Sequence, residues 1–80
     1  MPAPDQKNIK QYLQEYNIDD NELKAKFLQK ITRTIHDRND LVIEYEKTDD
    51  EYKREQIKAD IQELEQKIKE KLEKFKQNNN

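Results

Sequence analysis

The spacing of apolar residues along the chain predicts three helical segments. In the first segment, apolar positions are separated by three or four residues, which places them on one face of a helix. They are Ile9, Tyr12, Leu13 and Tyr16. We expect this helix over residues 5–16, with Asp5 as its N-cap and Asn8 in the place that Glu or Gln holds in a capping box.

The first helix is expected to end at Asn17, a residue type that adopts the left-handed conformation usually supplied by glycine. Ile18 would then fold back onto the helix as an apolar contact. A second helix is expected over residues 20–47. Asp19 is its predicted N-cap, and Glu22 completes an acidic variant of the capping box at the positive end of the helix dipole.

An apolar stripe continues through the second helix. Its members are Leu23, Phe27, Leu28, Ile31, Ile35, Leu41, Val42 and Tyr45. The stretch 36–40 (HDRND) contains four poor helix formers and no strongly apolar residue. A continuous helix is the favoured interpretation, and a kink or break at 36–40 is the alternative.

A third helix is expected over residues 49–76. Residues 48–51 (TDDE) match the capping-box signature S/T-x-x-E, with Thr48 as the N-cap. The apolar positions that follow are Tyr52, Ile57, Ile61, Leu64, Ile68, Leu72 and Phe75. From Ile57 onward the spacings are three or four residues, which is typical of a coiled-coil-like seam.

Two observations favour a helical hairpin over one straight rod. At about 100° per residue, the apolar centre of the second helix differs from that of the third by about 100°, so an unbroken helix would present two different apolar faces. A very short connection at Thr48 makes the two helices antiparallel neighbours. This arrangement also brings the acidic residues of 19–22 beside the lysine-rich segment 67–76. A single rod over 20–76 is the structural alternative.

The composition is consistent with a small helical protein. Apolar residues make up 31% and charged residues 42% of the 80 residues, a balance that would suggest disorder if the apolar residues were not regularly spaced. The sequence contains no glycine, which makes β-hairpins difficult to build. We therefore expect an all-α fold in a single domain over residues 1–80, with 1–4 and 77–80 as loose termini.

Residue types that most enzymes use are missing. There is no Ser or Cys nucleophile, no glycine for a phosphate-binding loop, and His36 is the only histidine. Residues 49–51 are acidic but lack the EF-hand pattern. We expect no enzymatic activity, cofactor, metal or small-molecule substrate. No apolar run is long enough for a membrane span or a signal peptide, so we expect a cytoplasmic protein without a membrane partner.

Protein–protein interaction through the tip of the hairpin is the favoured function. The first helix is too short to cover the whole hairpin and is expected over its open end, near Phe27 and Phe75. At the tip, three consecutive apolar residues fan across about 200° of helix surface, so they cannot all face the third helix. The predicted protein-binding residues are Leu41, Val42, Ile43, Tyr45 and Tyr52. A second copy that buries them would give a homodimer with a four-helix bundle; the other interpretation is a different protein partner.

Nucleic-acid binding is the alternative function. Basic residues on the expected outer part of the second helix would contact phosphates, and the lysines of 67–76 form a second basic patch. The candidate residues are Lys26, Lys30, Arg33 and Arg38. The net charge of −2 provides no general attraction for a polyanion, and no recognised nucleic-acid-binding motif is present. We therefore rank this function second.

Overall fold

The computed structural model describes residues 5–78, which form three α-helices and one short 3₁₀ turn. The elements are α1 (Ile9–Glu15), η1 (Asp20–Glu22), α2 (Ala25–Lys47) and α3 (Glu51–Asn78). No β-strand occurs within the described residues, so the predicted all-α class is confirmed. Residues 77 and 78, which we expected to be loose, belong to α3, whereas 1–4 and 79–80 lie outside the described residues.

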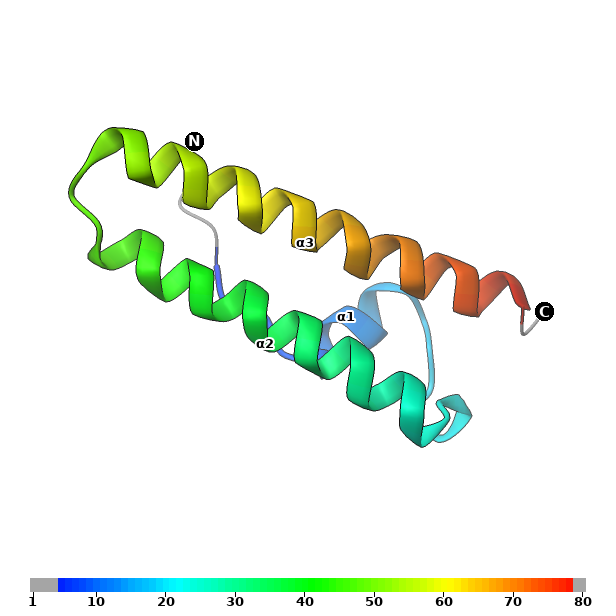
Figure 1. Cartoon of the computed structure of the whole chain (residues 1–80). Coiled ribbons are helices and arrows are strands. Elements are labelled where there is room, and N and C mark those ends of the chain that lie inside the picture. The colour runs from blue at the N-terminus through cyan, green and yellow to red at the C-terminus, as the bar shows by residue number, and fades with distance from the viewer. Residues whose placement is uncertain (1–4, 79–80) are drawn as a thin grey trace.

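Helices α2 and α3 pack against each other as an antiparallel hairpin in a molecule that measures 45 × 19 × 18 Å (Figure 1). The chain reverses direction across residues 48–50, so the predicted break at Thr48 is confirmed and the alternative of one rod is wrong. Helix α2 is continuous through 36–40, as favoured from the sequence. Helix α1 lies on one side of the pair, behind α2 and α3 in the view of Figure 1.

Helix α1 begins at Ile9, four residues later than predicted, because Asn8 and not Asp5 is its N-cap. The Asn8 side chain accepts a hydrogen bond from the Gln11 backbone amide (3.0 Å), and the Gln11 side chain accepts one from the Asn8 amide (2.8 Å). This reciprocal pair is a complete capping box and satisfies two amides at the helix start. Residues 5–8 precede the helix and are not helical.

The end of α1 follows the prediction. Asn17 has a φ angle of 55°, in the left-handed region. The Asn17 amide donates to the Gln14 carbonyl (3.2 Å), and the Ile18 amide donates to the Leu13 carbonyl (2.9 Å). These two bonds form a Schellman motif, which satisfies carbonyl groups at the helix end. Ile18 is buried, so the predicted fold-back contact is confirmed.

Helix α2 begins at Ala25, five residues later than predicted. The Asp19 side chain accepts a hydrogen bond from the Asn21 amide (3.0 Å), and the Asp19 carbonyl accepts one from the Glu22 amide (3.0 Å). Asp19 therefore stabilises the separate turn η1 and does not cap α2. The N-cap of α2 is Lys24, which makes no capping hydrogen bond with its side chain.

The reversal between α2 and α3 does not use the predicted capping box. Thr48 is the extended C-cap of α2, and its hydroxyl donates to the Glu44 carbonyl (2.8 Å). The side chain of Asp50 accepts a hydrogen bond from the Tyr52 amide (2.9 Å). Asp50 therefore satisfies an amide in the first turn of α3, which begins at Glu51 rather than at residue 49.

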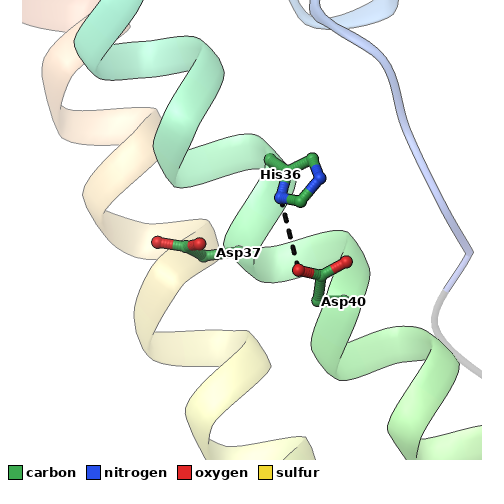
Figure 2. Close-up of side chains that lie close together, drawn as sticks. All are labelled: His36, Asp37 and Asp40. Carbon is green, nitrogen blue, oxygen red and sulfur yellow. Dashed lines mark ion pairs between the residues drawn. The ribbon is translucent and has the colours of Figure 1, made fainter.

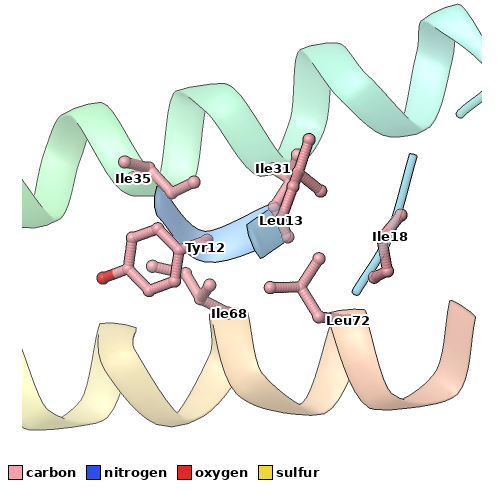
Figure 3. Packing of buried hydrophobic residues seen from close by; sticks show 7 residues of the cluster. All are labelled: Tyr12, Leu13, Ile18, Ile31, Ile35, Ile68 and Leu72. Atoms are coloured by element: carbon pink, nitrogen blue, oxygen red, sulfur yellow. The ribbon is translucent and has the colours of Figure 1, made fainter. Parts of the chain in front are cut away.

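The apolar core consists of two clusters along the hairpin. The larger cluster lies at the open end, where α1 packs over α2 and α3 (Figure 3). Its buried members are Tyr12, Leu13, Ile18, Ile31, Ile35, Ile68 and Leu72. Phe27 and Phe75 pack against this cluster and stack with their ring centroids 5.1 Å apart, so the predicted position of α1 over the open end is confirmed. The smaller cluster, at the tip, is formed by Val42, Ile57 and Ile61.

Candidate interaction surface

Arg38 lies between the two apolar clusters and joins α2 to α3 and to the N-terminal segment. It is only 5% exposed. Its Nε atom lies 3.0 Å from Oε2 of Glu65, as an ion pair rather than as an aligned hydrogen bond. Its Nη1 atom donates to the Asp5 carbonyl and to Oδ1 of Asn39, the latter at 2.8 Å. A buried arginine in an apolar seam needs such partners, because an unpaired buried charge is costly.

Tyr12 connects α1 to the same carboxylate. Its hydroxyl donates to Oε2 of Glu65 at 2.7 Å. Burial of the ring, followed by this hydrogen bond, raises the pKa of Tyr12 above its ordinary value. The Glu65 carboxylate on α3 therefore receives polar groups from both α1 and α2, which fixes the position of α1 along the hairpin.

Residues 5–8 lie along α2 on the same side as α1. The side-chain amide of Asn39 binds the Lys7 backbone twice: the Lys7 amide donates to Oδ1 (3.1 Å), and Nδ2 donates to the Lys7 carbonyl (2.6 Å). The Lys7 ammonium also pairs with Oε1 of Glu15 at 2.7 Å. Together with the contact between Arg38 and Asp5, these bonds hold the segment against the hairpin. One side of the α2–α3 seam is thus covered by α1 and residues 5–8.

The opposite side of the hairpin, toward the viewer in Figure 1, is covered by no other element in residues 5–78. An α-helix turns by about 100° per residue, so Leu41 lies about 200° around α2 from Asn39, which marks the covered side. On α3, Leu64 and Glu65 flank the seam on its two sides, with Glu65 toward α1. Leu41 and Leu64 are both partly buried.

We call this uncovered surface the open face. By helical position it is lined by Lys30, Thr34, Asp37, Leu41 and Glu44 on α2 and by Asp60, Leu64, Lys67 and Lys71 on α3. Thr34 and Leu41 are seven residues apart, two helical turns, so they share one row along α2. The open face therefore has a narrow apolar centre with charged residues on both edges.

The structure does not gather the five predicted protein-binding residues on one surface. Val42 is 0% exposed in the tip cluster, and Leu41 and Tyr45 pack against that cluster. Arg54 covers the Tyr45 ring, with its guanidinium carbon 4.4 Å from the ring centroid. Much of the apolar tip is thus used by the hairpin itself, and Val42 is not available to a partner.

The remaining predicted residues point in other directions. Ile43 lies about 200° from Leu41 and so falls on the covered side of α2, where it is partly exposed. Tyr52 is 71% exposed at the start of α3. Of the predicted set, Leu41 alone lies on the open face. Leu64 and Thr34, which share this face, were not singled out from the sequence because Leu64 continued the apolar stripe and Thr34 is polar.

The predicted nucleic-acid-binding residues are also separated. Lys26, Lys30 and Arg33 are exposed on α2. The prediction for Arg38 is wrong: it is buried against Glu65 and is not on the outer part of the helix. The signal for this was its position, since Ile31, Ile35, Arg38 and Val42 follow one another at spacings of four, three and four residues. This is the spacing of the buried stripe, and the charge of Arg38 obscured it.

One histidine and two aspartates lie close together on the surface of α2 (Figure 2). The potential ligand atoms of His36, Asp37 and Asp40 all lie within 4.8 Å of one another, and Nδ1 of His36 is 3.3 Å from Oδ2 of Asp40. All three residues are exposed, with the side chains of His36 and Asp40 at 74% and 60%. A contact between such solvated groups on one helix contributes little to stability, and we interpret it as a surface pair.

Comparison with known proteins finds no matching family model, no similar curated protein and no similar solved structure. Within residues 5–78, no helix is long and apolar enough to cross a membrane. Inferences about function therefore depend on the geometry of the chain itself.

Proposed function

We propose that this chain is a non-catalytic protein–protein interaction module that binds a helical partner on its open face. The observation that supports this most directly is the unequal cover of the α2–α3 seam. Helix α1 and residues 5–8 cover one side, whereas Leu41 and Leu64 remain partly exposed on the other. A two-helix seam is buried more completely when further helices pack on it, as in helical bundles.

The shape of the open face favours helices as the partner. Thr34 lies between the larger residues Phe27 and Leu41 in a row spaced by seven residues. A small residue between large ones leaves a position into which a partner side chain fits, as in knobs-into-holes packing. The charged edges would then select the partner and its register. The partner is either a second copy, which gives a homodimer with a four-helix core, or another protein whose activity or assembly the module regulates.

Nucleic-acid binding remains the second candidate. The antiparallel hairpin brings Lys26 and Lys30 of α2 to the same end as the lysine-rich end of α3, which favours a basic patch there. This candidate loses Arg38 as a phosphate contact. Both edges of the patch also contain acidic residues, such as Glu70 and Glu73, so we rank it below protein binding.

Two threonines of α2 provide a matched test of the open face. Thr34 lies on this face, and Thr32 lies about 200° around the helix from it and is exposed. The Thr34 hydroxyl donates to the Lys30 carbonyl within the helix (3.0 Å), so its removal breaks no tertiary hydrogen bond. Thr34→Arg places a long charged side chain on the open face, and Thr32→Arg adds the same side chain elsewhere.

Each full-length variant would be used with an affinity tag to capture partners from extracts of the native cells. We expect the wild type and Thr32→Arg to retain one stoichiometric partner and Thr34→Arg to lose it. Circular dichroism should show the same helicity for all three proteins, which separates loss of binding from loss of folding. Retention of the partner by Thr34→Arg together with its loss from Thr32→Arg would contradict the proposal, as would the absence of any stoichiometric partner.

A further inference from the structure

Charge is separated along the length of the hairpin. Residues 40–60, which form the tip half, contain eight acidic and four basic residues. Residues 24–39 and 61–78, which form the open-end half of α2 and α3, contain ten basic and five acidic residues. The hairpin therefore has an acidic tip and a basic open end.

The same separation is present on the open face. Phe27 lies opposite Phe75, and Arg38 lies opposite Glu65, which fixes the level of every residue along the antiparallel pair. In this register the two acidic residues Glu44 and Asp60 are level with each other in the tip half. Towards the open end, Lys30 is level with Lys71, and Lys67 lies next to them on α3. Lys53 is a basic exception near the tip.

We propose that a second copy of this chain binds on the open face in an antiparallel orientation, with the acidic tip of each copy against the basic open end of the other. This inference rests on the proposed function, because it names the partner of the same surface. A two-fold axis across the hairpin relates the copies, so that α3 packs along α3 and α2 along α2 in opposite directions. Asp60 of one copy then faces Lys67 and Lys71 of the other, and Glu44 faces Lys30.

The alternative orientation, tip to tip, brings like charges together. A two-fold axis along the hairpin sets α2 of one copy opposite α3 of the other at the same level. Glu44 then faces Asp60, and Lys30 faces Lys71, at both edges of the interface. Opposed like charges disfavour an association, and opposite charges select its register. The tip-to-tip dimer that the sequence suggested is therefore the less favourable arrangement.

The size of the open face is adequate for a stable dimer. The hairpin measures 45 by 19 Å, and a face of these dimensions corresponds to roughly 800 Å² per copy, which is the size of a standard specific interface. Its apolar centre contains Leu41 and Leu64 and its rim contains charged residues, which is the usual anatomy of such interfaces.

Sedimentation equilibrium of the purified full chain tests the partner, and charge reversal tests the orientation. We expect a dimer with twice the chain mass of 9.8 kDa, and its Kd should rise with ionic strength. Asp60→Lys and Lys67→Glu should each raise Kd roughly tenfold, because each substitution acts twice in a symmetric dimer. The double variant should restore most of the affinity. Glu55→Lys is the control, since it makes the same charge change on α3 away from the open face.

Three results would overturn the inference. Tighter association of Asp60→Lys, or tighter association in high salt, would indicate the tip-to-tip orientation. A monomer at every concentration would exclude the second copy, while capture experiments with Thr34→Arg would still test the proposed function separately. Salt-sensitive binding of the monomer to short duplex DNA or single-stranded RNA, lost in Lys67→Glu, would assign the basic end to nucleic acid instead.

Discussion

Replacement of Arg38 by methionine tests whether the buried polar contacts hold the N-terminal segment in place. Asn39 Oδ1 accepts hydrogen bonds from both Arg38 and the Lys7 amide, and Arg38 also donates to the Asp5 carbonyl. Methionine keeps an unbranched apolar side chain in the seam but removes every donor. We expect residues 5–8 to detach while the hairpin remains folded.

The magnitude follows from the exposure of the partners. Two hydrogen bonds are lost, and each contributes roughly 0.5–1.5 kcal/mol net. The ion pair with Glu65 adds less than about 1 kcal/mol, because the Glu65 side chain is 39% exposed and is screened by water. Removal of a buried charge from an apolar seam offsets part of this loss. The expected net destabilisation is about 1–2 kcal/mol, and each kcal/mol lowers Tm by roughly 4–8 °C in a domain of this size.

Urea denaturation followed by circular dichroism measures the global effect, and amide hydrogen exchange measures the local one. The Lys7 amide should lose its protection in Arg38→Met, whereas amides in the middle of α2 should keep theirs, apart from the global decrease in stability. Unchanged protection at Lys7 would refute the reasoning, and so would a variant that is more stable than the wild type.

Three further predictions concern single side chains. Since burial and the bond to Glu65 raise the pKa of Tyr12, the folded chain keeps the phenolic proton to higher pH than the unfolded chain; stability should therefore fall above about pH 10, and Tyr12→Phe should reduce that fall in urea titrations across this range. Asn17→Gly should raise stability by up to about 1 kcal/mol, because glycine adopts the φ angle of 55° more readily, and thermal unfolding would detect it. Ile31→Ala should cost about 2–5 kcal/mol in the same assay, because Ile31 is 0% exposed, whereas Leu28→Ala at a 36% exposed position should cost much less.

The sequence was sufficient to predict the order of the helices, the reversal at Thr48 and the left-handed end of α1. These features depend on residues close to one another in the chain. The apolar stripe changes phase at residue 48, and Asn17 is followed directly by the apolar Ile18. Such local signals determine where a helix ends, whatever packs on it later.

The helix starts were predicted less well because several capping residues competed. Asp5 and Asn8 both satisfy the preference for an N-cap, and Asn8 was favoured by its reciprocal bonds with Gln11. Thr48 matched a capping box, but its hydroxyl is used by the Glu44 carbonyl and Asp50 takes its place. Propensity alone does not distinguish between neighbouring candidates of this kind.

The candidate surface was predicted only in part because it depends on long-range contacts. Arg38 binds Asp5 and Glu65, which are distant in sequence. These contacts place α1 and residues 5–8 on one side of the hairpin and leave the other side open. Once that side is known, Leu41 and Ile43 are separated into opposite directions. No pattern within α2 alone would have indicated which side is covered.

Backbone amide chemical shifts of the purified chain, recorded during dilution from millimolar to micromolar concentration, test the central claim most directly. The account predicts concentration-dependent shifts at Thr34, Leu41 and Leu64 on the open face, with little change at Asn39 and Ile43 on the covered side. Shifts confined to the covered side or to the tip around Tyr52, or a spectrum that does not change with concentration, would contradict it.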